Sequence, residues 1–400
     1  MLQQTNNFIS KIKQIFATAR PSSVAPAGLL GLFAFITVSF TSLHIRLIKC
    51  RPCRAKIAAL FCGNNIFSKS RRVSILLTVS TTYGKKAITP CQSRRDDTLL
   101  TVGATYGTTI RIIAPARRVS LEDIQPAMQL LTSCGYEVDL GRYTLGAYHQ
   151  FSGTDDERAS DLQDAIDEDS VKAIWCARGG YGGLRILDKI DFSKFRQNPK
   201  WICGYSDTTA LHALINNLLH LPSLHCTMPI HIQNQEDLHK PSLSTMLAAL
   251  EKGKLTYEIP AHRLNRVGEA KGKLTGGNLS ILYALNGSVS DIKTDNSVLF
   301  IEEVDEYLYH IDRMMLCLKR AGKLAQLAGL IVGGMSDMHD NTISYGKTAE
   351  EIIYEHVAEY DYPVCFGFPA GHIQENSALI LGGSITLCIE PKNVYIQNNI

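Results

Sequence analysis

The sequence predicts an α/β protein with two domains of that class. Three observations predict it. Apolar runs typical of buried strands alternate with helical patterns from Thr109 onward. A stretch with charge, glycine and short alternating runs interrupts them near residue 256, and the alternation of strands and helices then resumes. Strands that alternate with helices build βαβ units, which form a parallel sheet with helices on both faces. At 400 residues the chain is long enough for two such domains.

The first α/β domain is expected over residues 106–255. Its first strand, TIRIIA, ends before Pro115. Ser120 and Asp123 then have the spacing of a helix-capping pair, and Gly135 is placed to end that helix. The other elements expected are strands over 136–140, 170–177 and 201–204, and helices over 156–168, 183–190 and 206–219. The result is a mostly parallel sheet of the flavodoxin or Rossmann kind.

A linker is expected at residues 256–272, where charge, glycine and short alternating stretches replace the earlier pattern. A second, smaller α/β domain follows over residues 273–400. Its expected strands are residues 297–304 and 328–335, and its expected helices are residues 306–322 and 347–360. Ligands of parallel sheets bind beyond the carboxyl ends of the strands, so residues that follow a strand are the first candidates for a site.

Residues 1–105 form a basic extension that differs from the rest of the chain. The first hundred residues hold 15 Lys and Arg against two acids, whereas residues 101–400 hold 26 basic and 36 acidic residues. We expect this extension to lack a stable fold. The uncharged stretch 21–43 leaves a second interpretation open, in which residues 1–45 act as a signal or anchor and the protein is exported or contacts the membrane. Nucleic-acid binding is not expected, because the positive charge lies outside the organised fold.

The cysteine pattern predicts free thiols and no metal site. Seven of the eleven cysteines stand singly in apolar surroundings, which is typical of buried thiols. Cys50 and Cys53 have CxxC spacing, but no second pair follows at zinc-finger distance.

Ser206 lies where a predicted strand, WICG, meets a predicted helix. A serine at such a turn is exposed beside the free N–H groups of the first helical turn, which is the arrangement of a nucleophile elbow. The G-x-S-x-G form is not met, because Thr208 stands at the second glycine position. On this stretch alone, a helix cap at Ser206 or Asp207 is the favoured interpretation, because such residues commonly cap helices.

Three further loops carry candidate chemistry. Gly179–Gly183, in RGGYGG, follows a strand and can bind a phosphate, complete an oxyanion hole, or serve only as a tight turn. Glu302 and Glu303 end a strand, and His372 lies in a loop bracketed by glycine and proline. A nucleophilic serine needs a histidine base and an acid that orients it.

Five segments in order resemble one known family. ARGGYGG, GYSDTTAL, KLTGGNLSILYAL, IEEVDEYLYHIDRMM and GFPAGHIQEN resemble the signature segments of the LD-carboxypeptidases. These are serine peptidases that remove the terminal D-alanine from tetrapeptides of recycled peptidoglycan. The resemblance begins near Thr109 and reaches the C-terminus. It implies two α/β domains, with the serine on the first and the acid and histidine on the second.

The resemblance implies a role for each matching residue. Ser206 would be the nucleophile and His372 the general base, with Glu302 orienting the imidazole and Glu303 as the alternative acid. The oxyanion hole would be the backbone N–H groups of Gly180 and Asp207. No metal and no organic cofactor is expected.

An exopeptidase must also bind the free carboxylate of its substrate. Arg178 is the candidate cation from its position, and Tyr181 in the same turn is a second candidate substrate-binding residue. The resemblance further implies a muropeptide substrate, a cytoplasmic location and a homodimer. The residue that precedes D-alanine, diaminopimelate or lysine, stays open.

The sequence departs from the family pattern at two places. SALILGG follows the histidine loop where the family has a TLPLG-like stretch, and CTMP follows His225 where the family often has Gly-Pro. Both departures affect the expected pocket. Three alternatives stay open: an amidase of the microcin C self-immunity type that cleaves aminoacyl-nucleotides, a nucleotide-binding protein, and a non-catalytic murein-binding protein.

Overall fold

A computed structural model describes residues 35–38, 73–76 and 108–400 of the chain. Contacts divide the chain into two units, Met1–Arg95 and Asp96–Ile400. In the first unit, strands β1 (Phe35–Val38) and β2 (Val73–Leu76) pair antiparallel. The other predictions for residues 1–105, including the Cys50–Cys53 pair, lie outside the described residues and stay predictions. None of the described helices has the length and apolar character needed to cross a membrane.

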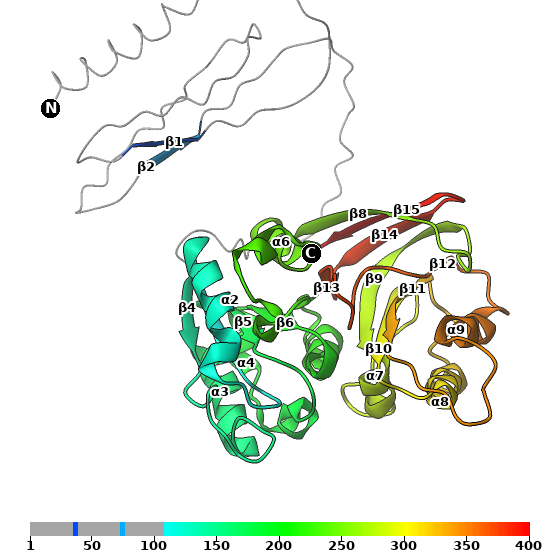
Figure 1. Cartoon of the computed structure of the whole chain (residues 1–400), viewed down its shortest axis with the longest axis horizontal. Helices are drawn as coiled ribbons and strands as arrows, with labels where there is room; N and C mark the ends of the chain where they lie inside the picture. Colours follow the sequence, from blue (N-terminus) through cyan, green and yellow to red (C-terminus); the bar gives the residue numbers. More distant parts are fainter. Residues whose placement is uncertain (1–34, 39–72, 77–107) are drawn as a thin grey trace, which may run out of the picture. The chain divides into compact units, whose positions relative to one another are not determined.

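The second unit contains two sheets (Figure 1). The first sheet has six strands in the order β13-β7-β6-β5-β3-β4. All of its neighbouring strands are parallel except β13 and β7, which confirms the predicted mostly parallel sheet. The strands are β3 (Thr109–Ile113), β4 (Glu137–Leu140), β5 (Val171–Cys176), β6 (Trp201–Gly204), β7 (Ser223–His225) and β13 (Leu379–Leu381).

Helices cover both faces of this sheet because its strands are apolar on both sides. On β5, Ala173 and Trp175 pack in one buried cluster with α2 and α6, and Ile174 and Cys176 pack in another with α3 and α5. Ser120 caps α2 through the predicted reciprocal hydrogen bonds. The helices are α2 (Leu121–Ser133), α3 (Asp155–Asp167), α4 (Ser193–Gln197), α5 (Thr209–Leu214) and α6 (Pro241–Lys252).

Two helix predictions in this sheet need correction. The expected helix over 183–190 is two 3-10 turns, η1 (Gly183–Arg185) and η2 (Leu187–Lys189). A short segment that begins with a glycine gains too few hydrogen bonds to offset the cost of starting an α-helix. The Gly183 N–H donates to the Asp207 carboxylate. The expected helix over 206–219 is a 3-10 turn η3 (Ser206–Thr208), then α5, then a π-helical turn η4 (Ile215–Leu219).

The second sheet has seven strands in the order β12-β11-β10-β9-β14-β15-β8. The pairs from β12 to β9 are parallel and those from β9 to β8 are antiparallel. Residues 256–272, expected to be a linker, instead supply most of β8 and the start of β9, because their alternating residues have the period of a strand. The strands are β8 (Lys254–Pro260), β9 (Gly268–Asn278), β10 (Ser297–Val304), β11 (Gly329–Ser336), β12 (Val364–Cys365), β14 (Ser384–Ile389) and β15 (Asn393–Asn399).

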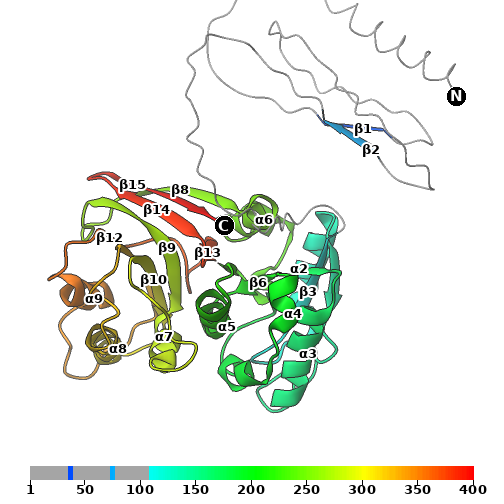
Figure 2. The same cartoon turned by 180° about the vertical axis from the view of Figure 1, so that it is seen from behind.

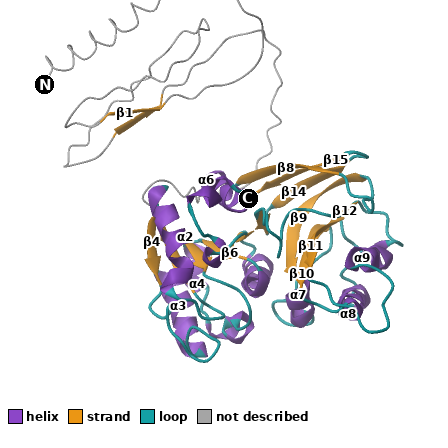
Figure 3. Cartoon of the chain, in the orientation of Figure 1, coloured by secondary structure: helices purple, strands orange, loops and turns teal. Residues whose placement is uncertain are grey.

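Three helices cover the parallel part of the second sheet. Leu299 and Ile301 of β10 face α7 (Leu279–Leu285), α8 (Leu308–Arg320) and α9 (Ala349–Val357) in one buried cluster. The alternate residues Val298 and Phe300 pack in a different cluster, with β14 and β15. Figure 2 shows these helices grouped beside β10, and Figure 3 shows them beside β10 and β11. The predicted strands and helices of this region are therefore confirmed.

Strand β13 connects the two sheets. It follows the loop that holds His372 and pairs antiparallel with β7, with Leu379 opposite His225. The C-terminal part of the chain thus returns to the first sheet and supplies its edge strand. This return holds the histidine loop near the carboxyl end of β6, where Ser206 lies.

His212 is expected to make the fold sensitive to acid. The ring is fully buried on α5, where its Nε2–H donates to the Gly204 carbonyl at 2.9 Å. Burial, opposed only by that hydrogen bond, lowers the pKa of His212 from 6.5 to about 4. The unfolded imidazole therefore binds a proton first as the pH falls, so its stabilisation is complete above about pH 6.5 and is lost toward pH 4, by up to about 3 kcal/mol.

Urea unfolding at pH 7 and pH 4.5 tests this expectation. The wild-type protein should lose more unfolding free energy between the two conditions than His212→Gln, whose amide can keep the bond to Gly204 and does not titrate. Equal losses would show that His212 takes no part in the acid sensitivity.

Candidate functional site

Ser206 occupies a sharp turn between β6 and η3. Its φ is +61°, in the left-handed region that costs a residue other than glycine about 1–3 kcal/mol. Gly204 makes the turn possible, because a Cβ at that position would lie 2.8 Å from the Thr208 hydroxyl. Neither Ser206 nor Asp207 caps the helix through its side chain, so the capping interpretation is wrong. The serine is held in a strained conformation that leaves its hydroxyl free for another partner.

His372 bonds both Ser206 and Glu302. The Ser206 Oγ lies 3.1 Å from His372 Nε2, and His372 Nδ1 lies 2.7 Å from Glu302 Oε2. The backbone N–H of His372 donates to the same Glu302 oxygen at 3.2 Å. Gly371 allows this approach, since a Cβ there would lie 2.7 Å from Glu302. The structure therefore brings together three residues that the sequence separates by up to 166 positions.

The two neighbouring glutamates have different partners. Glu302 is fully buried and contacts the histidine. Glu303 points to the other side of β10 and accepts hydrogen bonds from Asn278 Nδ2, the Ser280 N–H and the Val304 N–H at 2.6–3.0 Å. Glu303 thus stabilises the start of α7, and only Glu302 can orient His372 in this geometry.

The surroundings of His372 favour its charged form. Burial opposes protonation of the ring, but the hydrogen bond and negative charge of Glu302 outweigh it and raise the pKa of His372. Tyr205 lies against the ring, with centroids 4.7 Å apart. Burial also raises the pKa of Tyr205 and lowers that of His231, so the tyrosine O–H donates to His231 Nε2 at 2.9 Å.

The glycine turn lies directly against the serine. A Cβ on Gly179 would be 2.9 Å from the Ser206 Oγ, and the next residue, Gly180, has a φ of +110° and lies under the Arg117 side chain. The Asp207 carboxylate accepts the Gly183 N–H at 2.7 Å and so ties this turn to η3. Within residues 108–400 the structure records no acceptor for the N–H of Gly180 or of Asp207. Both predicted donors are available to a ligand.

Arg158 holds the glycine turn in place, and sequence reasoning missed it. Its buried guanidinium donates to the carbonyls of Pro115, Gly153 and Gly182 and pairs with Asp155. A buried charge is retained only where such partners satisfy it. An arginine on a polar helical stretch gives no sequence signal of this role, because only the fold brings the three carbonyls to it.

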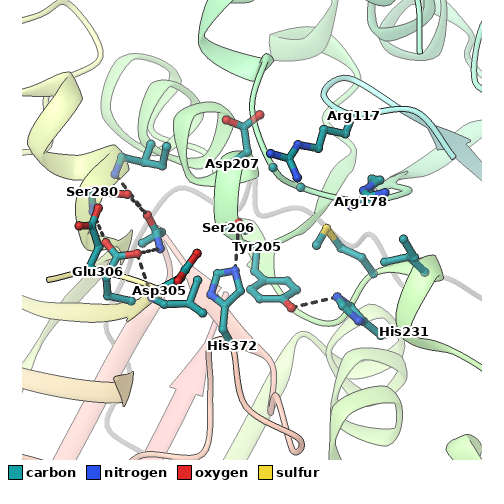
Figure 4. A pocket seen from close by; sticks show the side chains of 18 residues that line it. Arg117, Arg178, Tyr205, Ser206, Asp207, His231, Ser280, Asp305, Glu306 and His372 are labelled. Atoms are coloured by element: carbon teal, nitrogen blue, oxygen red, sulfur yellow. Dashed lines mark hydrogen bonds between the residues drawn. The ribbon is translucent and has the colours of Figure 1, made fainter. Parts of the chain in front are cut away.

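A pocket of about 400 Å³ opens at Ser206 and His372. Figure 4 shows arginines on one side of these residues and acids on the other. We define the arginine side as Arg117 and Arg178, and the acidic rim as Asp305 and Glu306. The other lining residues are Gly179, Gly180, Tyr205, Asp207, Met228, Ile230, His231, Asn278, Ser280, Ile281, Glu303 and Val304.

Of the two predicted substrate-binding residues, the structure places one in the lining of the pocket and the other outside it. Arg178 lines the pocket, and its guanidinium donates a long 3.4 Å hydrogen bond to the Arg118 carbonyl. Tyr181 is 46 % exposed, packs against Phe151 and is not among the residues that line this pocket. Arg117 lines the pocket but escaped the sequence analysis. Its position just after β3, at a strand's carboxyl end, was the available signal.

The described part of the chain contains no metal-ligand cluster of three or more His, Cys, Asp or Glu residues. Its seven cysteines are free, and four of them are buried.

Comparison with known proteins gives two family matches. Residues 110–226 match the LD-carboxypeptidase N-terminal domain, and residues 271–387 match the LD-carboxypeptidase C-terminal domain. The chain is 32 % identical over 294 residues to a probable murein peptide carboxypeptidase of Bacillus subtilis, which covers 73 % of this chain and 92 % of that protein. It is 27 % identical over 292 residues to a murein tetrapeptide carboxypeptidase of Pseudomonas aeruginosa, and this match covers 70 % of this chain and 92 % of that protein.

Solved structures show the same architecture. A muramoyltetrapeptide carboxypeptidase from Oxalobacter formigenes superposes with a TM-score of 0.67 at 27 % identity, covering 73 % of this chain and 99 % of that one. A microcin C7 self-immunity protein in complex with aspartyl sulfamoyl adenosine gives a TM-score of 0.67 at 22 % identity. This match covers 74 % of this chain and 98 % of that one. At that identity the second likeness concerns the fold alone.

Proposed function

Because the chain belongs to the LD-carboxypeptidase family, we propose that it is a serine carboxypeptidase that releases the terminal D-alanine from murein tetrapeptides. The observation that carries this proposal is the line of hydrogen bonds from Glu302 through His372 to Ser206, at the floor of a pocket. The relatives named as murein peptide carboxypeptidases support the choice of substrate.

Ser206 is the nucleophile in this proposal. Its Oγ attacks the carbonyl carbon of the residue before D-alanine while His372 Nε2 accepts the hydroxyl proton. The imidazolium then donates that proton to the amine of the leaving D-alanine. Water, deprotonated by the same nitrogen, hydrolyses the acyl-enzyme. Glu302 holds the ring in the required tautomer and stabilises its positive charge, and no step needs a metal or an organic cofactor.

The N–H groups of Gly180 and Asp207 are assigned to the oxyanion. Both lie beside Ser206 and have no recorded acceptor within residues 108–400. A donor aimed at the developing negative charge is worth roughly 3–4 kcal/mol in enzymes where it has been removed. Arg158 and Asp207 position these donors, since both bond the glycine turn.

The arginine side binds the free carboxylate of D-alanine. Arg117→Ala and Arg178→Ala are each expected to raise KM about tenfold or more, because a charge-assisted hydrogen bond is worth about 1.5–3 kcal/mol. KM is measured with a D-alanine-terminated peptide and with its C-terminal amide, which lacks the charge. The amide should be a poor substrate for the wild type and no poorer for the variants.

Arg142→Ala serves as the matched control for these variants, because Arg142 is exposed and does not line the pocket. Unchanged KM values in both pocket variants would show that another group binds the carboxylate.

The proposal also includes the cellular setting that the family implies. The enzyme acts in peptidoglycan recycling, in the cytoplasm and as a homodimer. Fractionation of cells and sedimentation of the purified chain test location and oligomeric state separately from activity.

Release of D-alanine from murein tetrapeptide by the purified full chain tests the proposed function. Aminoacyl sulfamoyl adenosine is offered in parallel. Release of D-alanine supports the proposal, and a folded protein that releases none overturns it. Cleavage of the adenosine compound alone would favour the aminoacyl-nucleotide amidase. Failure of Ser206 to react with a serine-directed phosphonate, together with no cleavage of either substrate, would favour a binding protein.

A further inference from the structure

The loop that holds His372 is closed at its base by the side chain of Asn376. Asn376 is 4 % exposed, and its Oδ1 accepts the Gly371 N–H at 2.8 Å. The segment that this bond encloses, 372–375, begins with the histidine, and residues 373–375 are exposed. Exposed residues have few packing contacts to fix their conformation, so a buried bond across the base of the loop has a large part in setting its shape.

Gly371 connects this bond to Glu302. It has a φ of +113°, and a Cβ on it would lie 2.7 Å from the Glu302 carboxylate. The next residue, His372, directs both its backbone N–H and its Nδ1 to one oxygen of Glu302, at 3.2 and 2.7 Å. A displacement of Gly371 therefore changes the contact between the ring and the acid, and with it the direction of His372 Nε2 toward Ser206 (Figure 4).

Asn376 is itself fixed by helix α6. Its N–H donates to Ser242 Oγ at 2.8 Å, and the Ala378 N–H donates to Thr245 Oγ1 at 2.9 Å. Ser242 and Thr245 are three residues apart, so both hydroxyls lie on one face of α6. The same helix packs in one buried cluster with β6, the strand that leads to Ser206. Asn376 thus sets the position of the histidine loop relative to the serine.

Asn376 acts on the site through other residues. It is not among the residues that line the pocket at Ser206, and its side-chain oxygen contacts the backbone of Gly371 rather than the imidazole. Its expected effect is therefore on the placement of His372 and not on the binding of a ligand in that pocket.

We propose that Asn376 is a positioning residue that places His372 for proton transfer by fixing Gly371 through its side-chain oxygen. The inference rests on the proposed function, in which His372 is the general base. What the position requires is a hydrogen-bond acceptor, because the Gly371 N–H is buried and would otherwise lose its partner. A carboxyl group of the same shape as the amide meets this requirement, whereas an apolar side chain does not.

The test compares Asn376→Ala, which removes the acceptor, with Asn376→Asp, which keeps it. Asn376→Ala is expected to lower kcat for D-alanine release about 10²-fold and to leave KM within about threefold, because misplacement of a reacting group by about 1 Å has an effect of that size. Asn376→Asp should keep kcat within about tenfold of the wild-type value. The rate at which a serine-directed phosphonate labels Ser206 should fall in the same order, and this rate does not depend on the peptide.

Asn265→Ala is the matched control. Asn265 Oδ1 accepts the Phe366 N–H at 2.7 Å, so this variant loses an equivalent bond that does not involve the histidine loop. It should be destabilised to a similar extent in urea unfolding, with kcat unchanged. Ser242→Ala is a second variant, which keeps the asparagine side chain but removes the acceptor of its N–H. It should lower kcat about tenfold, and it provides the test where Asn376→Ala does not fold.

The inference is overturned by a kcat of Asn376→Ala within about threefold of the wild type, or by an unchanged kcat in Ser242→Ala where the alanine variant does not fold. An aspartate variant as slow as the alanine variant, or an equal loss of kcat in Asn265→Ala, also overturns it. All of these results include release of D-alanine by the wild type. Failure of the proposed function gives no release by the wild type, so the two failures are distinguishable.

Discussion

Replacing Ser206 with alanine is expected to lower kcat for D-alanine release at least about 10⁴-fold while peptide binding is retained. In the proposed mechanism the hydroxyl forms the acyl-enzyme, and removing the nucleophile of a catalytic triad typically costs 10⁴- to 10⁶-fold. Release is followed by a D-amino-acid assay, and binding is measured by calorimetry on the same preparation. Residual activity within about tenfold of the wild type would show that Ser206 is not the nucleophile.

A second variant at the same position separates catalysis from folding. Ser206→Gly is expected to be equally inactive but more stable than the wild type by about 1 kcal/mol, because glycine adopts the φ of +61° without steric cost. The measurement is urea unfolding of both variants. Stabilisation with loss of activity is the pattern of a strained catalytic position, whereas a destabilised glycine variant would mean that the turn carries no strain.

Replacing Glu302 with glutamine is expected to reduce kcat about 10⁴-fold, whereas Glu303→Gln should leave kcat within about tenfold. Only Glu302 bonds His372, and an amide in its place favours the wrong tautomer of the ring. Glu303 instead accepts three hydrogen bonds at the start of α7, so its replacement should mainly lower stability, by about 1–2 kcal/mol. Steady-state kinetics and thermal unfolding of the two variants provide a matched comparison.

The same pair of variants should differ in pH dependence. In the proposed mechanism His372 must be neutral to accept the serine proton, so kcat/KM is expected to rise with pH and to level off above the pKa of His372. Glu302 raises that pKa above 6.5. The acid limb should therefore move to lower pH in Glu302→Gln and stay in place in Glu303→Gln. A limb that moves in neither variant would mean that another group controls it.

Local patterns predicted most elements of residues 109–219 and the strands and helices of residues 297–357, but not strands β7, β8, β9, β12, β13, β14 and β15. Most strands are continuous buried runs, such as 201–204, and the capping pair Ser120–Asp123 begins its helix as predicted. The errors arose where long-range contacts override a local pattern. The strand residues within 256–272 pair with β14 and β15, which come more than a hundred positions later.

Part of the candidate site was predictable from local patterns, because some of its residues stand at the ends of strands. Ser206 and His372 follow strands, and Glu302 lies near the carboxyl end of β10, which is where sheet ligands bind. Arg158 follows no strand, and nothing in its neighbourhood shows that three distant carbonyls converge on it.

By itself, the sequence determined the α/β class, the order of those elements that it predicted and the candidate residues for the chemistry, because these depend on hydrophobic period, turn residues and side-chain type. The tertiary structure placed Glu302, and not Glu303, against His372, excluded the capping role of Ser206, and placed arginines and acids on opposite sides of the pocket. Adjacent residues on a strand point to opposite faces of the sheet. Because β10 is paired on both sides, Glu302 and Glu303 are held on opposite faces and have different partners.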